Sequence, residues 1–270
     1  MRILEHHSSR IVVHASAPTD ALASVVLWLG GTPHTGALLQ PVVAAGTSVA
    51  RDIVSIARAG YGGAPRHEGR NVADAADEIV QVLDLLDLDD VIVAGFSGGG
   101  PHAIAVGAAR PQRTRAVLTF GCIAPYGTTD EWFAGMADPS GLQAAAKGLN
   151  ARTAHPDEFD PSSFIPADHA ALEGTWRDLV LDTQASDLYG PSGAIDDDMA
   201  FVRPWGFSLD ECTTPVVLLH GQKDRIVPVR HANVIAERLP RATVSIHPNE
   251  GHVSILRSLD TELRKIAKDG

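Results

Sequence analysis

Short apolar runs, each too short for a helix, recur along the chain and restrict the folds open to it. The runs are rich in β-branched residues, which is typical of strands buried on both faces of a sheet. They occupy residues 11–14, 25–29, 53–56, 91–94, 116–120, 216–220 and 243–246. We therefore predict a strand at each of these positions.

Helical patterns lie between the later runs. In residues 72–86 the apolar side chains recur at spacings of three and four, which makes one face of a helix apolar. Residues 99–109, 230–239 and about 254–268 have the same pattern. Strands that alternate with helices predict an α/β protein with a mostly parallel sheet covered by helices on both faces. The first two or three strands have little helix between them, so antiparallel pairing stays open there.

The alternation lapses between Tyr126 and Trp205, where prolines, aromatic residues and the acidic triplet Asp196 to Asp198 gather. We predict that residues 126–205 form a helical insertion and that residues 1–125 and 206–270 form the core. Open α/β sheets bind their ligands at the carboxyl ends of the strands, so the insertion is a candidate cap over a site. A lobe that only stabilises the fold is the alternative.

Composition narrows the possible partners. The net charge of −11 on 270 residues gives no electrostatic reason to bind nucleic acid or an anionic membrane. The start lacks the apolar core of a secretory signal, and no run of about 18 apolar residues could span a bilayer, so we expect a cytoplasmic protein. The two cysteines exclude a disulfide framework, and the histidines and cysteines lack metal-ligand spacing. The sequence does not constrain the oligomeric state.

The segment Gly95-Phe96-Ser97-Gly98-Gly99 stands between a predicted strand and a predicted helix. It matches Gly-x-Ser-x-Gly, in which a strained turn exposes the serine as a nucleophile. Gly95 and Gly99 omit side chains where strand and helix nearly touch. The backbone N–H of Gly98 would face the oxygen that gains charge when Ser97 attacks a carbonyl.

A phosphate-binding loop is the competing interpretation of these glycines. A Walker loop ends in Gly-Lys-Ser or Gly-Lys-Thr, whereas Gly100 is followed by Pro101 and His102. A dinucleotide fingerprint needs a glycine two residues after Gly95, and Ser97 occupies that position. Nucleotide binding is therefore disfavoured.

Two later loops carry the partners that a serine nucleophile needs. Asp224 follows the predicted strand 216–220, and His252 follows the predicted strand 243–246. The order serine, aspartate, histidine is the order of the α/β-hydrolase triad. We predict that His252 removes the Ser97 proton while Asp224 orients the imidazole and offsets its charge.

Other residues compete for these roles. His247 and Glu250 lie close to His252, but His247 precedes a proline and lacks the adjacent glycine that lets the loop bend. His102 is interpreted as a packed residue on the helix after Ser97. Nothing around Cys122 resembles a turn built to expose a thiolate.

A second oxyanion donor should come from the loop after the strand 25–29, which reads Gly30-Gly31-Thr32-Pro33. We choose the backbone N–H of Thr32, a role that does not require its side chain.

With these motifs the chain resembles the α/β-hydrolase superfamily, serine type with a helical cap, similar to esterases and prolyl-iminopeptidase-like enzymes. The resemblance covers nearly the whole chain and includes Gly221-Gln222-Lys223-Asp224 and Gly251-His252. It implies hydrolysis without a cofactor and a cap inserted after the sixth strand. Two segments depart from the family pattern: Gly30-Gly31 replaces His-Gly, and Ala57-Arg58-Ala59-Gly60 replaces Asp-Arg-Pro-Gly. These departures concern the bracing of the oxyanion loop and leave the triad intact.

These observations predict a serine hydrolase that acts on a small or medium acyl substrate, with a carboxylic ester as the first choice. The aromatic residues of the insertion are candidates for the pocket wall: Trp132, Phe133, Trp176 and Tyr189. An aminopeptidase or amidase, with acidic residues among Asp196 to Asp198 binding an ammonium group, is the second choice, although a run of carboxylates is usually a solvated face. A non-catalytic ligand receptor on the same fold is the third.

Overall fold

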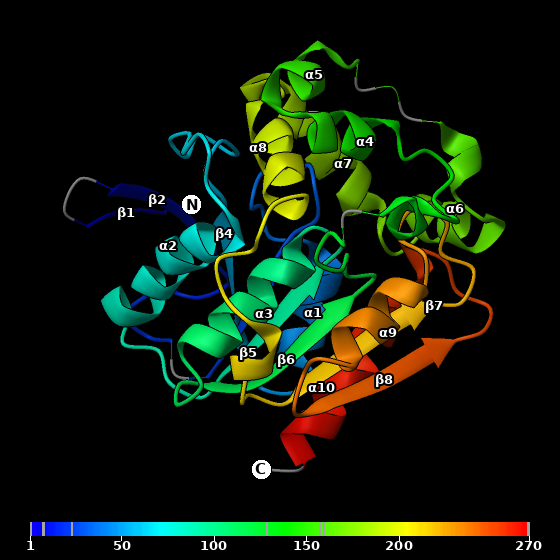
Figure 1. Cartoon of the computed structure of the whole chain (residues 1–270). Coiled ribbons are helices and arrows are strands. Elements are labelled where there is room, and N and C mark those ends of the chain that lie inside the picture. The colour runs from blue at the N-terminus through cyan, green and yellow to red at the C-terminus, as the bar shows by residue number, and fades with distance from the viewer. Residues whose placement is uncertain are drawn as a thin grey trace.

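The computed structural model describes residues 2–6, 9–22, 24–127, 129–156, 158 and 160–268. One sheet of eight strands runs through it, in the order β1-β2-β4-β3-β5-β6-β7-β8 (Figure 1). The strands are β1 (Arg2–His6), β2 (Ser9–Ala15), β3 (Val25–Leu29), β4 (Asp52–Ala57), β5 (Val91–Phe96), β6 (Thr114–Phe120), β7 (Val216–Gly221) and β8 (Ala242–His247).

The sheet is mostly parallel. β1 pairs antiparallel with β2, β2 pairs antiparallel with β4, and every pairing from β4 to β8 is parallel. The parallel strands therefore bring their carboxyl ends to one edge. Strands β3 and β5 are buried along their whole length, as expected for strands covered on both faces.

Helices cover both faces of the sheet (Figure 1). On one face α2 (Val72–Leu85), α3 (Gly99–Ala109) and α9 (Arg230–Ala236) pack into one apolar cluster. On the other face α1 (Gln40–Thr47) and α10 (Leu259–Lys268) pack into a second cluster with Trp28 and Phe120. The start of α2 is fixed by a capping box, in which Asn71 and Asp74 each accept the other's backbone N–H.

The sequence predictions for these elements are confirmed in type, and the differences lie in short elements. The predictions omitted β1 and the eight-residue α1, neither of which has a long periodic pattern. The predicted helix 254–268 is two elements, a 3₁₀ helix (Ser254–Ser258) followed by α10. Of the first predicted strands, only 11–14 pairs antiparallel with its neighbour β4, while 25–29 is parallel to β4.

The segment between β6 and β7 contains helices and no strand among its described residues. Its α-helices are α4 (Ser140–Lys147), α5 (Leu149–Ala154), α6 (Pro166–Glu173), α7 (Arg177–Ser186) and α8 (Ser192–Phe201). Figure 1 shows these helices gathered at one end of the sheet. They contact the loops that follow β3 and β8, which places them over the carboxyl ends of the strands.

Within the described ranges, no helix is both long enough and apolar enough to cross a bilayer.

Candidate active site

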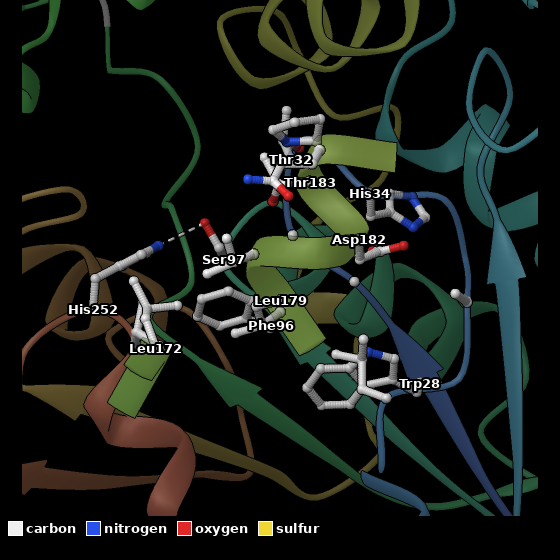
Figure 2. Close-up of a pocket in the computed structure, with 18 of the residues that line it drawn as sticks. Trp28, Thr32, His34, Phe96, Ser97, Leu172, Leu179, Asp182, Thr183 and His252 are labelled. Carbon is white, nitrogen blue, oxygen red and sulfur yellow. Dashed lines mark hydrogen bonds between the residues drawn. The ribbon is translucent and has the colours of Figure 1, made fainter. Parts of the chain in front are cut away.

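Ser97 stands on the sharp turn between β5 and α3, with a φ of +51° that non-glycine residues seldom adopt. A Cβ on Gly95 would lie under 3.0 Å from the backbone of Gly99, and a Cβ on Gly99 would collide with the backbone of Leu29. The glycines on both sides of Ser97 are therefore required by close backbone contacts. Figure 2 shows the Ser97 hydroxyl pointing toward the His252 ring.

The structure brings Ser97, His252 and Asp224 into one hydrogen-bonded row. The Nε2 atom of His252 lies 2.9 Å from the Ser97 Oγ, and its Nδ1 atom lies 2.8 Å from an Asp224 carboxylate oxygen (Figure 2 shows the first contact). Because the carboxylate can only accept, Nδ1–H donates to Asp224 and Nε2 is left to accept from the serine hydroxyl. The three side chains come from the loops after β5, β7 and β8, as predicted.

Asp224 is almost fully buried and is held by its own loop. The backbone N–H groups of Ile226 and Val227 donate to its second carboxylate oxygen at 2.9 and 2.8 Å. Burial alone would raise the pKa of Asp224, but the charge of His252 and hydrogen bonds from His220 and His252 hold it well below its ordinary value. The carboxylate therefore stays ionised beside the imidazole.

The rival residues stand apart from this row. His247 contacts the Ser245 hydroxyl at 3.2 Å on β8. His102 is fully buried and its Nδ1–H donates to the Gly98 carbonyl at 2.8 Å, so it packs beneath the turn. Burial raises the pKa of the Cys122 thiol well above its ordinary value, which disfavours a thiolate. Among the described residues, no group of three or more His, Cys, Asp or Glu side chains is placed to hold a metal ion.

The two residues chosen for the oxyanion hole lie side by side. A Cβ on Gly98 would meet the Thr32 side chain, and a Cβ on Gly31 would lie 3.4 Å from the Ser97 Cβ. Within the described part of the chain, the N–H groups of Thr32 and Gly98 donate to no other protein atom. Two free donors beside a serine hydroxyl are the arrangement that a developing oxyanion needs.

Arg58 braces the oxyanion loop. Its guanidinium donates to the carbonyls of Gly30 and Gly31 at 2.6 and 2.9 Å, and to the Thr32 hydroxyl at 3.2 Å. This arginine belongs to one of the two segments that depart from the family pattern. A planar fork of donors holds three consecutive loop residues, which provides the bracing that the sequence left open.

Asp197, on α8, neutralises that arginine. Its carboxylate accepts from Arg58 at 2.6 Å, Arg70 at 2.5 Å, Tyr61 at 2.9 Å and the Thr32 hydroxyl at 2.6 Å. Burial alone would raise the pKa of Asp197, but the charges of Arg58 and Arg70 hold it well below its ordinary value. The Thr32 side chain, for which the sequence predicted no role, is thus tied to the β6–β7 segment.

The neighbouring carboxylates are engaged as well. Asp196 forms a two-pronged ion pair with Arg66 at 2.8 and 2.9 Å, and Asp198 accepts from Arg152 at 2.6 Å. The triplet is therefore neither a solvated face nor a set of free acids for a substrate ammonium. Both interpretations of the triplet, as an ammonium-binding site and as a solvated face, were wrong, because the arginines that pair with it lie far away in the sequence.

A second carboxylate of the β6–β7 segment holds the chain just beyond the oxyanion loop. Asp182, on α7, accepts from the Thr35 backbone N–H at 3.2 Å and from the Thr35 hydroxyl. Burial raises the pKa of Asp182, and the hydrogen bonds from Thr35 offset part of that effect. Asp178, one turn earlier, accepts from the Gln40 backbone N–H at 2.7 Å.

A cavity of about 470 Å³ opens beside Ser97 and His252. Its walls come from the sheet side and from α6 and α7, and most of them are apolar (Figure 2). The apolar lining residues include Trp28, Leu39, Phe96, Phe164, Leu172, Leu179, Val180, Ile226 and Val253. Such a cavity suits a small or medium ligand with an apolar group next to the serine.

The aromatic residues predicted for the pocket wall do not line this cavity. Trp132 and Phe133 pack edge-to-face against each other near His231, which makes them part of the interior. Trp176 is buried and stacks on Trp28, one layer behind the wall, and Tyr189 is 47% exposed. The prediction failed because the three buried aromatic side chains pack against the α/β core and the fourth, Tyr189, faces solvent.

Sequence reasoning assigned no role in the site to Arg58, Asp168 or Asp182, and it considered Asp197 only as a ligand of a substrate ammonium. The sequence offers one signal for Arg58, a charged residue directly after the apolar run of β4. In the structure this residue is 2% exposed. The three aspartates lie on helices of the β6–β7 segment and bind groups of the core that are remote in sequence. Nothing local distinguishes them from the other aspartates of that segment.

Two curated relatives resemble the chain in sequence. A putative carbamate hydrolase, RutD, from Caulobacter sp. (strain K31) is 27% identical over 192 residues, which are 67% of this chain and 65% of the relative. The chain thus spans just under two thirds of that relative. The pimeloyl-[acyl-carrier protein] methyl ester esterase of Aromatoleum aromaticum is 26% identical over 234 residues, 83% of this chain and 88% of the relative.

A solved structure has the same fold over nearly the whole chain. The bromoperoxidase of Bacillus anthracis superposes with a TM-score of 0.72 at 22% identity, covering 96% of this chain and 94% of that one. The family model described as alpha/beta hydrolase fold matches residues 25–258. This range begins with β3 and ends with the short 3₁₀ helix that follows His252. The chain belongs to the α/β hydrolase fold family.

Proposed function

We propose that the chain is a serine hydrolase that cleaves a small or medium carboxylic ester, with Ser97 as nucleophile, His252 as base and Asp224 as the residue that orients the base. The proposal rests on one observation, the hydrogen-bonded row Ser97–His252–Asp224 at the mouth of an apolar cavity. That row supplies the nucleophile, base and orienting acid that acyl transfer requires.

The geometry supports a two-step reaction. Ser97 Oγ attacks the ester carbonyl while its proton passes to His252 Nε2, and the N–H groups of Gly98 and Thr32 stabilise the oxyanion. His252 then protonates the departing alcohol, and a water molecule, deprotonated by His252, releases the acid from Ser97. Asp224 keeps its charge in acid, since its pKa lies well below its ordinary value, so it continues to orient the base.

In this proposal residues 126–205 are a cap domain on a core of residues 1–125 and 206–270. Helices α6 and α7 contribute Leu172, Leu179 and Val180 to the cavity wall, and Phe164 joins them from just before α6, so the cap shapes the pocket for an acyl chain or an alcohol group. The relatives named as an esterase and as a putative carbamate hydrolase support a carbonyl substrate.

An aminopeptidase remains a weaker candidate. Its substrate ammonium needs an available carboxylate in the cavity, and the acidic triplet is already paired with arginines. Asp182 is the carboxylate among the cavity residues, and both of its oxygens accept from Thr35. An ester, which needs no such group, fits the lining better.

Labelling with a fluorophosphonate probe tests the proposal. The intact protein should gain one adduct, and peptide mapping should place it on Ser97, while Ser97→Ala should gain none. p-Nitrophenyl esters of increasing acyl length, compared with aminoacyl arylamides, should then show ester cleavage with a preference for short or medium chains. A protein that forms no adduct and cleaves neither series would instead favour a ligand receptor.

A further inference from the structure

One helix of the cap faces both the cavity and the loop of the catalytic base. Asp168 and Leu172 are four residues apart on helix α6 and share one of its faces, and Phe164 stands just before the helix. Phe164 and Leu172 line the cavity beside Ser97. Asp168, between them, is 1% exposed and takes no part in the reaction described above.

The Asp168 carboxylate binds the backbone of the His252 loop. One oxygen accepts from the N–H groups of Val253 and Ser254 at 2.9 and 2.8 Å, and the other accepts from the His252 N–H at 3.3 Å. The second oxygen also accepts from the N–H of Ile165, at the start of the same helix, at 3.2 Å. A buried carboxylate with this many donors fixes the backbone on both sides of it.

The glycine before His252 is explained by the same carboxylate. A Cβ on Gly251 would lie under 3.0 Å from the carboxyl carbon and both carboxyl oxygens of Asp168, which are its three nearest neighbours. The φ of Gly251 is not in the left-handed region, so backbone freedom does not demand a glycine here. The close approach of Asp168 does.

We propose that Asp168 is a positioning residue that fixes the backbone of residues 252–254 and thereby holds the His252 imidazole between Asp224 and Ser97. The catalytic part of this inference rests on the proposed serine hydrolase function. Asp224 orients the ring, and Asp168 fixes the loop from which the ring projects. A displacement of the base by about 1 Å is enough to cost about 100-fold in rate, so the loop needs such a hold.

Substitutions at Asp168 test this role. With p-nitrophenyl butyrate, Asp168→Ala should lower kcat by about 10- to 100-fold, while KM changes less than twofold because the cavity wall is retained. Asp168→Asn should lie between wild type and Asp168→Ala, since an amide oxygen can still accept while its NH₂ group opposes the remaining N–H groups. The rate of fluorophosphonate labelling should fall in the same order.

Asp178→Asn is the matched control. Asp178 also ties the cap to the core through a backbone N–H, that of Gln40, but away from the His252 loop. Its substitution should leave kcat and labelling within about twofold of wild type, as expected for a change remote from the reacting groups. Wild-type labelling rates in Asp168→Ala and Asp168→Asn would overturn the proposal.

Gly251→Ala gives a second route that does not depend on the folding of an Asp168 variant. The added methyl should displace the Asp168 carboxylate and slow labelling in the wild-type background. In Asp168→Ala the obstruction is gone, so Gly251→Ala should add little further loss, which is a non-additive cycle. Equal losses in both backgrounds would contradict the proposal.

Amide hydrogen exchange separates failure of this inference from failure of the proposed function. Exchange at Val253 and Ser254 should be faster in Asp168→Asn than in wild type, and unchanged in Asp178→Asn. If wild type forms no Ser97 adduct, the hydrolase proposal fails, and exchange still decides whether Asp168 holds the loop. Unchanged exchange in Asp168→Asn would refute that hold.

Discussion

The core and the cap contribute to the site in different ways. In the proposed mechanism the core supplies the reacting row Ser97, His252 and Asp224 and the two backbone donors. The cap supplies carboxylates that hold the loops carrying those groups, Asp168 on the base loop and Asp182 and Asp197 on the oxyanion side. In this proposal the core groups take part in the reaction, whereas the cap carboxylates act through the loops that they hold: Asp168 and Asp182 bind backbone N–H groups, and Asp197 binds side chains.

This division bears on how the cap can move. Each of the three carboxylates is at most 9% exposed and binds core atoms, so lifting the whole cap would expose three engaged acids and the groups they satisfy. Opening would replace these hydrogen bonds by bonds to water, and a hydrogen bond to a charged group contributes about 1.5–3 kcal/mol net. The cap is therefore better described as a fixed part of the catalytic apparatus than as a freely hinged cover.

The largest effect is expected from removing the reacting groups of the core. Ser97→Ala and His252→Ala should each lower kcat by about 10⁴- to 10⁶-fold, because the nucleophile or its base is lost. Asp224→Ala should cost somewhat less, since the base remains but is no longer oriented. Turnover of a p-nitrophenyl ester measures all three. Because these residues act as a unit, the double variant Ser97→Ala/His252→Ala should be no slower than either single one, and retained activity in Ser97→Ala would refute the assignment.

The same division separates what the sequence predicted from what it did not. The loops that carry Ser97, Asp224 and His252 have local sequence signals. Glycines flank Ser97 and precede His252, and each of the three loops follows an apolar strand. The order of the strands in the sheet then brings the loops together. The cap carboxylates have no such signature. Asp197 stands next to two other aspartates and is distinguished only by Arg58 and Arg70, more than a hundred residues away.

The residues that line the cavity could not be predicted from the sequence for a related reason. The cavity is lined by Leu172 and Leu179 of the cap, yet aliphatic residues at helical spacing read equally well as interior packing. Of the aromatic residues predicted instead, Trp132, Phe133 and Trp176 are interior and Tyr189 is half exposed. The way the cap packs on the core decides which face of a cap helix is directed toward Ser97. This is a tertiary property, and no local sequence pattern reports it.

The next largest effect should come from the cap, through Asp197. Asp197→Asn leaves Arg58 and Arg70 buried without a full counter-charge, so the free energy of unfolding should fall by about 3–5 kcal/mol. Asp196→Asn is the matched control on the same helix. Its partner Arg66 is 37% exposed, so the loss should be no more than about 1 kcal/mol. Urea unfolding measures the free energy of unfolding of both variants. Equal losses would show that the buried cluster around Asp197 contributes no more to stability than the exposed Asp196–Arg66 pair.

Acid should weaken the core through its buried neutral histidines. Burial, followed by the charge of Arg58, lowers the pKa of His102 to about 3 and that of His34 well below its ordinary value. Burial, followed by the charge of His220, lowers the pKa of His231 to about 4. Below about pH 6.5 the unfolded chain takes up protons at these sites and the folded chain does not. Stability is therefore fully present above that pH and is lost as the pH falls.

Urea unfolding at pH 7.5 and 5.5 checks this expectation. Each of the three histidines should cost about 1.4 kcal/mol by pH 5.5, and His102→Gln should remove one such contribution. Asp182 in the cap contributes to the pH dependence of stability with the opposite sign. Burial raises its pKa, so the folded state takes up a proton there more readily than the unfolded chain and gains stability as the pH falls. A stability that rises between pH 7.5 and 5.5 would place the dominant titration in the cap instead of the core.

The smallest effect is expected at Thr32, whose hydroxyl joins the oxyanion loop directly to the cap. The Thr32 hydroxyl donates to Asp197 and accepts from Arg58, while its backbone N–H is the proposed oxyanion donor. Thr32→Val keeps the N–H and the shape of the side chain, so the donor loses only its anchorage. We expect kcat to fall by about tenfold or less, equivalent to at most about 1.4 kcal/mol, with KM unchanged. Thr32→Ser keeps the hydroxyl and should retain most of the activity. If Thr32→Val were as active as wild type, Arg58 alone, through the carbonyls of Gly30 and Gly31, would suffice to hold the loop, and the cap would act on catalysis only at the His252 side.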